Sequence, residues 1–204
     1  MSKRIGTVEQ VEKRFPEDIA THQLEIVQDS GLFRYLRFRR PDRGFYWFDI
    51  TTWPGFLCVS GDMGCYVFSR IPDMFEFFRG KDGISYSYWA EKIKAADCNS
   101  PAREWSKEEF LAAVKNEVAE YTSREFKKRL RSAVGEQLGF VDCSNRHEAV
   151  NAVMAIEIDG HYPFSEFSES SCEDYTHQFA WCCNAIRWGI NQYDLAKQTK
   201  EIEA

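Results

Sequence analysis

The sequence predicts an α+β protein in which antiparallel strands come first and helices follow. Between about residues 22 and 70, apolar and polar side chains alternate with a period of two, and turn residues separate the alternating runs. From Pro72 onward, apolar residues recur at helical spacing instead. We therefore expect an antiparallel sheet of about five strands within residues 22–70. Helices from residues 72–200 should pack against it, in a single domain that covers residues 1–204.

Composition and charge limit the classes of protein to consider. The chain has 204 residues, of which 44% are hydrophobic and 15% aromatic, enough for an ordinary core. A net charge of −6 gives no general attraction to nucleic acid or to anionic membranes. We find no apolar run long enough to span a membrane and no signal peptide behind Met1, so we expect a cytoplasmic protein. The 7 cysteines should then be free thiols.

The first elements are a helix and a short strand. Thr7 and Gln10 form a capping box, which predicts a helix from Thr7 to about Ala20. Pro16 should kink or end this helix, because proline has no backbone N–H and clashes with the preceding turn. Leu24–Gln28 is expected to be the first strand.

Alternation then predicts further strands at residues 32–40, 46–51, 56–60 and 65–69. In such strands one face is apolar and the other polar, so alternate residues should enter the core. The residues that we place in the core are Leu36, Phe38, Phe48 and Ile50.

A hairpin turn is predicted at residues 61–64, Gly-Asp-Met-Gly, between the last two strands. Asp-x-Gly is typical of a type I turn closed by a left-handed glycine, so Gly64 should have a positive φ. A phosphate-cradling loop is the alternative, but such loops usually open a helix. In the register that we expect, Cys58 and Cys65 point to opposite faces and cannot bond to each other.

Helices are expected in the rest of the chain. A short apolar helix should end at Gly80, and Ser106 and Ser123 are in N-cap positions for two further helices. Other helices are expected at residues 86–96, 147–156 and 173–199, with loops at residues 98–104 and 160–171.

The most suggestive surface is a cluster of arginine and aromatic residues. It comprises Arg34, Arg37, Arg39, Arg40 and Arg43, interleaved with Tyr35, Tyr46 and Trp47. Such groups can hold phosphates and stack bases, as in proteins that bind single strands. Alternatively, they form a solvated sheet face on which guanidinium groups cover rings and pair with Glu25, Asp42 and Asp49. We favour the solvated face, because no RNA-binding motif accompanies the cluster. The candidate binding residues are Arg34, Tyr35, Arg37, Arg39, Trp47, Asp49 and Asp62.

Motifs for catalysis and for metal binding are weak. Asp49, Asp62 and Asp73 could exchange protons, but carboxylates near turns are ordinarily solvated or cap helices. A zinc site would have to draw on His161, Cys172, His177, Cys182 and Cys183. These residues lack Cys-x-x-Cys spacing, so we expect no metal and no cofactor. The sequence also lacks a Gly-x-Ser-x-Gly nucleophile elbow.

Three segments resemble those of a known family. They are TWPGFLCVSGDMGCYVFSR (Thr52–Arg70), DMFEFFR (Asp73–Arg79) and SYWAEKI (Ser87–Ile93), and the segment from Phe179 to Ile190 is also similar. The chain resembles uncharacterised small proteins of tailed bacteriophages and prophages, which carry a W-P-G-x-L-x-x-x-G-D-M-G hairpin and a Y-W-A-E-K helix. The resemblance covers about half the chain. It implies a virus-derived protein that acts inside a bacterial cell, without an activity to transfer.

These observations leave three functions open. The first is a non-catalytic phage accessory protein that binds a host or bacterial-defence component. The second is a nucleic-acid or nucleotide binder that uses the arginine and aromatic cluster. The third is an enzyme with chemistry around Asp49 and Asp62.

Overall fold

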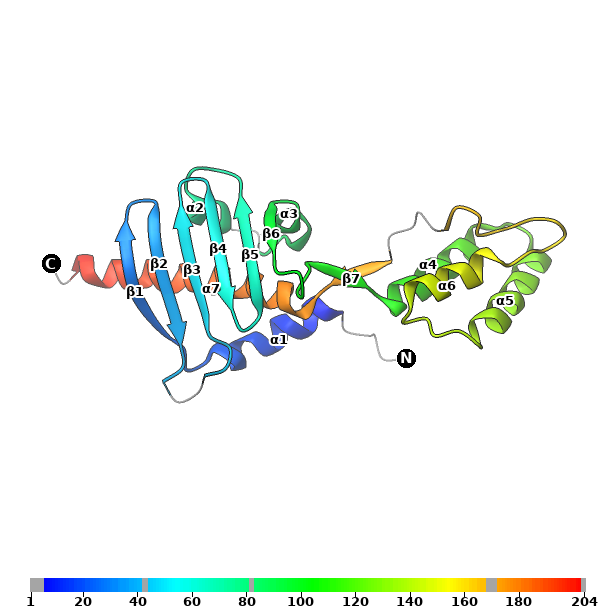
Figure 1. Ribbon diagram of the computed structural model, residues 1–204, viewed down its shortest axis with the longest axis horizontal. Helices are drawn as coiled ribbons and strands as arrows, with labels where there is room; N and C mark the ends of the chain where they lie inside the picture. The colour runs from blue at the N-terminus through cyan, green and yellow to red at the C-terminus, as the bar shows by residue number, and fades with distance from the viewer. Residues whose placement is uncertain (1–5, 42–43, 81–82, 168–171, 203–204) are drawn as a thin grey trace. The chain divides into compact units, whose positions relative to one another are not determined.

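The computed structural model describes residues 6–41, 44–80, 83–167 and 172–202. It confirms the α+β class, with a six-stranded antiparallel sheet in the N-terminal half and mainly helices in the C-terminal half (Figure 1). The chain groups into two compact units, one of residues 1–102 and 175–204 and the other of residues 103–174. Each unit has its own hydrophobic cluster. The single domain expected over residues 1–204 stays a prediction.

The sheet of the first unit has the strand order β1-β2-β3-β4-β5-β6, and each neighbouring pair is antiparallel. Its strands are β1 (Gln23–Ser30), β2 (Phe33–Arg39), β3 (Phe48–Trp53), β4 (Phe56–Gly61), β5 (Gly64–Ser69) and β6 (Ile93–Ala96). The first five correspond to the expected strands.

Strand β6 corrects the sequence analysis, which expects a helix over residues 86–96. The helix, α3, spans only Tyr86–Ala90, and the chain then extends beside β5. The backbone N–H of Ser69 donates to the carbonyl of Lys92, and that of Asp97 donates to the carbonyl of Cys65. Pairing with an otherwise open sheet edge thus outweighs the helical pattern of these residues.

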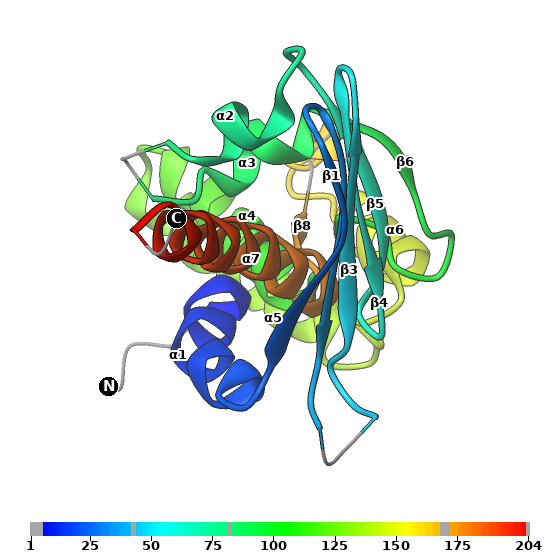
Figure 2. The same cartoon turned by 90° about the vertical axis from the view of Figure 1, so that its left-hand side faces the viewer.

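The other helices of the first unit are α1 (Thr7–Ile19), α2 (Met74–Phe78) and α7 (His177–Ile202). Helix α1 contains Pro16 and continues to Ile19, so this proline does not end it. Helix α7 begins later than expected, because Glu173–Tyr175 is a short strand, β8. Seen edge-on, the sheet has α1, α2, α3 and α7 on the same side (Figure 2). This covered face holds the core, and we call the opposite face the open face.

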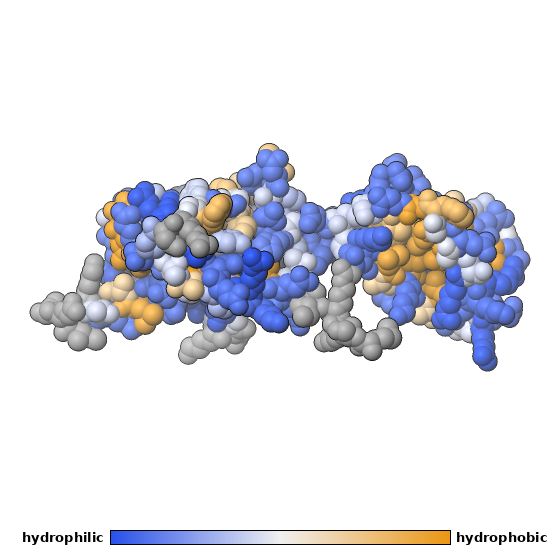
Figure 3. All heavy atoms as spheres, turned by 90° about the horizontal axis from the view of Figure 1, so that it is seen from below, coloured by the Kyte–Doolittle hydropathy of each residue, from blue (hydrophilic) through white to orange (hydrophobic). Residues whose placement is uncertain are grey.

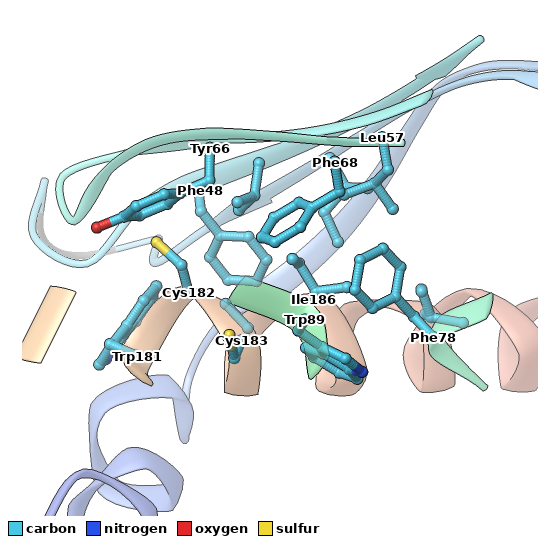
Figure 4. Packing of buried hydrophobic residues seen from close by; sticks show 14 of the residues in the cluster. Phe48, Leu57, Tyr66, Phe68, Phe78, Trp89, Trp181, Cys182, Cys183 and Ile186 are labelled. Carbon is cyan, nitrogen blue, oxygen red and sulfur yellow. The ribbon is translucent and has the colours of Figure 1, made fainter. Parts of the chain in front are cut away.

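The core of the first unit lies between the covered face and α7. Leu36, Phe38, Phe48 and Ile50 are each at most 1% exposed, which confirms the prediction for these residues. Figure 4 shows side chains of the sheet pointing toward those of α7, where Trp181 and Ile186 are buried.

Gly189 allows α7 to approach the sheet closely. A Cβ at this position would lie 2.7 Å from Ile50 Cδ1 and 3.0 Å from Phe38 Cζ. Any larger residue would therefore push the helix away from the sheet or displace these two side chains.

The hairpin between β4 and β5 is confirmed in one respect and corrected in another. Gly64 has φ +93°, as expected. However, Gly61 pairs with Gly64 and Ser60 with Cys65, so Cys58 and Cys65 lie on the same face. Their sulfur atoms are 3.7 Å apart. The expectation that these thiols point to opposite faces is therefore wrong.

The second unit is mainly helical. Its elements are β7 (Arg103–Trp105), α4 (Lys107–Glu120), α5 (Arg124–Leu138) and α6 (Arg146–Met154), and β7 pairs with β8. Ser106 and Ser123 cap α4 and α5 as predicted, since each hydroxyl accepts a backbone N–H three residues on. Phe110, Leu130 and Val153 are fully buried in its hydrophobic cluster. Throughout the described parts of both units, every helix is too short or too polar to cross a membrane.

Candidate functional site

The open face of the sheet presents the polar half of each alternating strand. Tyr35, Arg37 and Arg39 of β2 are half-buried on this face, while Leu36 and Phe38 between them are buried on the other. This is the division that the sequence predicts.

The strand register places charged residues of opposite sign side by side. Arg37 on β2 lies between Glu25 on β1 and Asp49 on β3. Arg37 Nη1 donates to Glu25 Oε2 at 3.1 Å, and Arg39 Nη1 lies 2.8 Å from Asp49 Oδ1. Each of these two arginines therefore meets a carboxylate from a neighbouring strand.

Tyr35 connects these two ion pairs into one network. Arg37 Nη2 donates to the Tyr35 hydroxyl at 2.9 Å, and that hydroxyl donates to Asp49 Oδ2 at 3.0 Å. The hydrogen bond with Tyr35, and then the one with Glu25, raises the pKa of Arg37. We call Glu25, Tyr35, Arg37, Arg39 and Asp49 the open-face network. Two cations and two carboxylates make it balanced in charge.

Aromatic rings lie beside the arginines of the network. The Arg39 guanidinium is 4.4 Å from the centre of the Trp47 ring, and the Arg37 guanidinium is 5.4 Å from that of Tyr35. Guanidinium groups are attracted to ring faces at such distances. These contacts, together with the ion pairs, are the arrangement expected of a solvated sheet face.

Arg34 does not belong to this surface, and its inclusion among the binding residues of one face is wrong. It has the same parity as Leu36 and Phe38, so alternation turns it to the covered face. Its side chain is 9% exposed and donates two hydrogen bonds, of 2.8 and 2.9 Å, to the Asp73 carboxylate. The guanidinium also lies 4.4 Å from the centre of the Phe75 ring. Arg34 is therefore a structural residue that joins β2 to α2.

The remaining members of the arginine and aromatic cluster are dispersed. Tyr46 stacks on Trp181, a core residue, with ring centres 5.9 Å apart. Arg40 Nε donates to the Thr21 hydroxyl. Arg43, like the Asp42 expected as a partner, lies outside the described residues.

The structure separates the three candidate carboxylates for acid–base chemistry. Asp49 is held by Tyr35 and Arg39, whereas Asp62 lies in the turn of the β4–β5 hairpin. Among the described residues, Asp49 and Asp62 share no hydrogen-bond partner. Asp73 accepts the Phe75 N–H at 2.9 Å and thereby caps α2. The Arg34 hydrogen bonds hold the pKa of Asp73 below its ordinary value, so it is ionised at neutral pH.

The candidate zinc ligands do not form one site among the described residues. Cys182 and Cys183 are buried in the core of the first unit, and Cys172 is buried in that of the second. Within the described residues, no group of three or more His, Cys, Asp or Glu could hold a metal ion.

A groove of about 480 Å³, which was not predicted from the sequence, lies on the helical side of the first unit. Phe15 of α1 and Phe78 of α2 line it together with one side of α7. The α7 residues in its lining are Asn184, Arg187, Trp188, Ile190, Asn191 and Asp194. Polar residues at helical spacing within an otherwise apolar helix are the signal that could have found it.

Arg187 differs from the arginines of the open-face network. Arg79, which also lines the groove, pairs with Asp194 at 2.6 Å. Arg187 has no ion-pair or hydrogen-bond partner among the residues that the structure describes. Among the residues that the structure describes, Arg187 is therefore a cation of the groove that can meet an anion.

The second unit carries a different kind of surface. Figure 3 shows a hydrophobic area on it. Separately, Phe140, which follows α5, is 94% exposed. Exposed apolar areas often contact other molecules, but nothing in the structure identifies what would cover this one.

Comparison with known proteins adds no family. No family model matches the chain, and neither a curated protein nor a solved structure matches it. The resemblance to bacteriophage proteins therefore stays a prediction.

Proposed function

We propose that this chain is a non-catalytic binding protein that contacts another protein through the open face of its sheet. The observation that carries the proposal is the charge balance of the open-face network, in which Arg37 and Arg39 each meet a carboxylate. The resemblance stated above adds that the chain is a phage accessory protein and that its partner is a host or bacterial-defence component.

Charge balance favours a protein partner over nucleic acid. Phosphate binding depends on cations that can neutralise phosphates and release counterions. In the open-face network, Glu25 and Asp49 already neutralise the two arginines, so a phosphate would have to displace a carboxylate. Protein interfaces, by contrast, are enriched in arginine, tyrosine and tryptophan and include paired charges.

The open face also offers an apolar anchor. Trp53 of β3 and Phe56 of β4 are paired across the strands, and their rings stack with centres 5.3 Å apart. Both are half-buried. In protein interfaces, a few aromatic residues that become buried usually contribute most of the binding energy. Trp53 and Phe56 are of this type and lie on the same face as the open-face network.

A capture experiment with paired variants tests the proposal. The tagged chain is incubated with bacterial lysate, with and without nuclease, and the captured proteins are identified by mass spectrometry. We expect one partner that survives nuclease and is lost from a Tyr35→Ala/Trp53→Ala double variant. Tyr88→Ala is the control, because Tyr88 is an exposed aromatic residue of α3, on the helical side of the sheet. Retention of the partner by the double variant would contradict the proposal.

A second candidate function is supported by the groove beside α7. Arg187, without a partner among the described residues, could pair with an anionic group while the rings of Phe15 and Trp188 contact a planar one. A nucleotide has both groups. We would titrate a nucleoside monophosphate by calorimetry and expect Arg187→Gln to abolish binding and Arg37→Gln to preserve it. Equal heats for the wild type and Arg187→Gln would exclude this candidate.

A further inference from the structure

We infer that Cys58 and Cys65 form a site of reversible disulfide modification on the open face of the sheet. Cys58 lies on β4 and Cys65 on β5, seven positions apart in the chain. Their sulfur atoms are separated by 3.7 Å. This inference goes beyond the proposed function and does not depend on it.

The hairpin keeps the two thiols together. Cys65 is paired with Ser60, and Cys58 with Val67, so the cysteines are diagonal neighbours on one face of adjacent strands. Side chains in this relation are close enough to interact. A disulfide has a sulfur–sulfur distance of about 2.05 Å and a Cα–Cα distance below about 7 Å. Diagonal neighbours are about 7–8 Å apart, so closing the bond requires the side chains to rotate and the two strands to shift toward each other.

The other cysteines are in different surroundings. Cys182 and Cys183 are wholly buried in the core of the first unit, where burial raises the pKa of both thiols. Cys58 and Cys65 are only half-buried, so a small oxidant can reach them. Cys98 is exposed, but no contact links its sulfur to either thiol of the pair among the described residues.

The two thiols act one after the other in the reaction. Burial and the neighbouring Cys65 raise the pKa of Cys58 to about 12, so Cys58 keeps its proton at neutral pH. We place the first attack on the oxidant at Cys65, and the products are the same if the two thiols exchange roles.

With a peroxide as the oxidant, the Cys65 sulfur attacks one oxygen and breaks the O–O bond. This step gives a sulfenic acid, and the other oxygen leaves as water. The Cys58 sulfur then attacks the Cys65 sulfur, forms the S–S bond and releases a second water. Overall, two thiols and one hydrogen peroxide give one disulfide and two waters. A dithiol reductant reverses the change by thiol–disulfide exchange, and exposed disulfides are the more readily reduced ones.

Cleavage between the two cysteines gives a direct test. A Cys98→Ser variant is treated with hydrogen peroxide, remaining thiols are alkylated, and a protease that cuts before aspartate cleaves the chain at Asp62. We expect the peptide that contains Cys58 and the peptide that contains Cys65 to stay joined, with a mass two hydrogens below the sum of the two reduced peptides. Treatment with a dithiol reductant should separate them.

Two controls complete the experiment. Cys58→Ser in the same background should give fragments that separate, with a sulfenic acid trapped at Cys65 by a dimedone reagent. Fragments of the Cys98→Ser variant that separate without reductant would overturn the inference. A bond between Cys58 or Cys65 and any other cysteine would overturn it as well.

Discussion

The two faces of the six-stranded sheet are built from the same strands but hold their side chains in different ways. On the covered face, aromatic and aliphatic side chains such as Phe38 and Phe48 pack against α7 and are excluded from water. On the open face, Tyr35, Arg37 and Asp49 remain half-buried and hold one another by hydrogen bonds. We conclude that the covered face stabilises the fold and that the open face keeps its polar side chains partly exposed.

The largest expected effect is on the covered face. Phe48 is 1% exposed and stacks on Phe38 with ring centres 4.5 Å apart. Phe48→Ala should lower the free energy of unfolding by roughly 3–5 kcal/mol, because it removes a buried ring and leaves a cavity. Thr51→Ala, at a half-buried position of the same strand on the open face, should cost much less. Urea unfolding of both variants measures the difference, and equal losses would mean that the open face is also covered.

Arg34 tests whether the ion pair on the covered face differs from those on the open face. Arg34→Ala leaves the Asp73 carboxylate without its partner at a site where the arginine is 9% and the aspartate 23% exposed. We expect a loss of about 2 kcal/mol, less than for a fully buried pair because Asp73 is partly solvated. Arg37→Ala, which removes an ion pair with the 62% exposed Glu25, is the control. If both variants melt at the same temperature, burial does not distinguish the two pairs.

The pH dependence of stability should follow from the same pair. The pKa of Asp73 is lowered in the folded chain, so the unfolded chain binds more protons near the ordinary aspartate pKa of about 3.9. The stabilisation by this group is therefore fully present above that value and is lost as pH falls through the lower folded pKa. Unfolding measured between pH 7 and pH 3 should show the difference between wild type and Arg34→Ala shrinking toward acid. A difference that stays constant over this range would contradict the assignment.

The β4–β5 hairpin should show a smaller effect. Gly64 has φ +93°, and a Cβ there would lie 3.0 Å from the Ser100 Cβ. Gly64→Val should therefore cost roughly 1 kcal/mol or more. Val67→Ala on β5 is a comparison variant at a half-buried position with ordinary backbone geometry. An unchanged melting temperature for Gly64→Val would show that the turn relaxes without strain.

The smallest effect on stability is expected in the open-face network. Arg37→Ala and Arg39→Ala should each change the free energy of unfolding less than Arg34→Ala does, because exposed and partly exposed ion pairs contribute little. Thermal unfolding in low and high salt measures this contribution. A loss as large as that of Arg34→Ala in either variant would mean that the network, too, is part of the fold's stabilising core.

Alternation along single strands allowed much of the first unit to be predicted from the sequence. It placed Leu36, Phe38, Phe48 and Ile50 in the core, and it divided β2 into an apolar and a polar face. The same rule assigns Arg34 to the covered face, although it stands close in the sequence to the arginines of the open face. Proximity in sequence does not imply proximity on a surface, because neighbouring residues of a strand point to opposite faces.

Features that depend on pairing between distant segments could not be predicted in this way. Strand β6 forms because β5 offers it an edge, and the Cys58–Cys65 contact depends on the register between β4 and β5. The groove beside Arg187 requires α1 and α2 to lie along α7. None of these arrangements is encoded in the local period of the sequence.

One titration tests most directly whether the open-face network is neutralised by its own carboxylates. A labelled single-stranded oligonucleotide is titrated with the wild type and with Arg37→Ala/Arg39→Ala at two salt concentrations. If the carboxylates satisfy both arginines, we expect weak binding that is the same for the two proteins. Phosphate contacts by both arginines would instead give binding that weakens with salt, with a log–log slope that falls by about 1.4 in the double variant. Micromolar binding of that kind would contradict the charge balance on which the proposed protein-binding function rests.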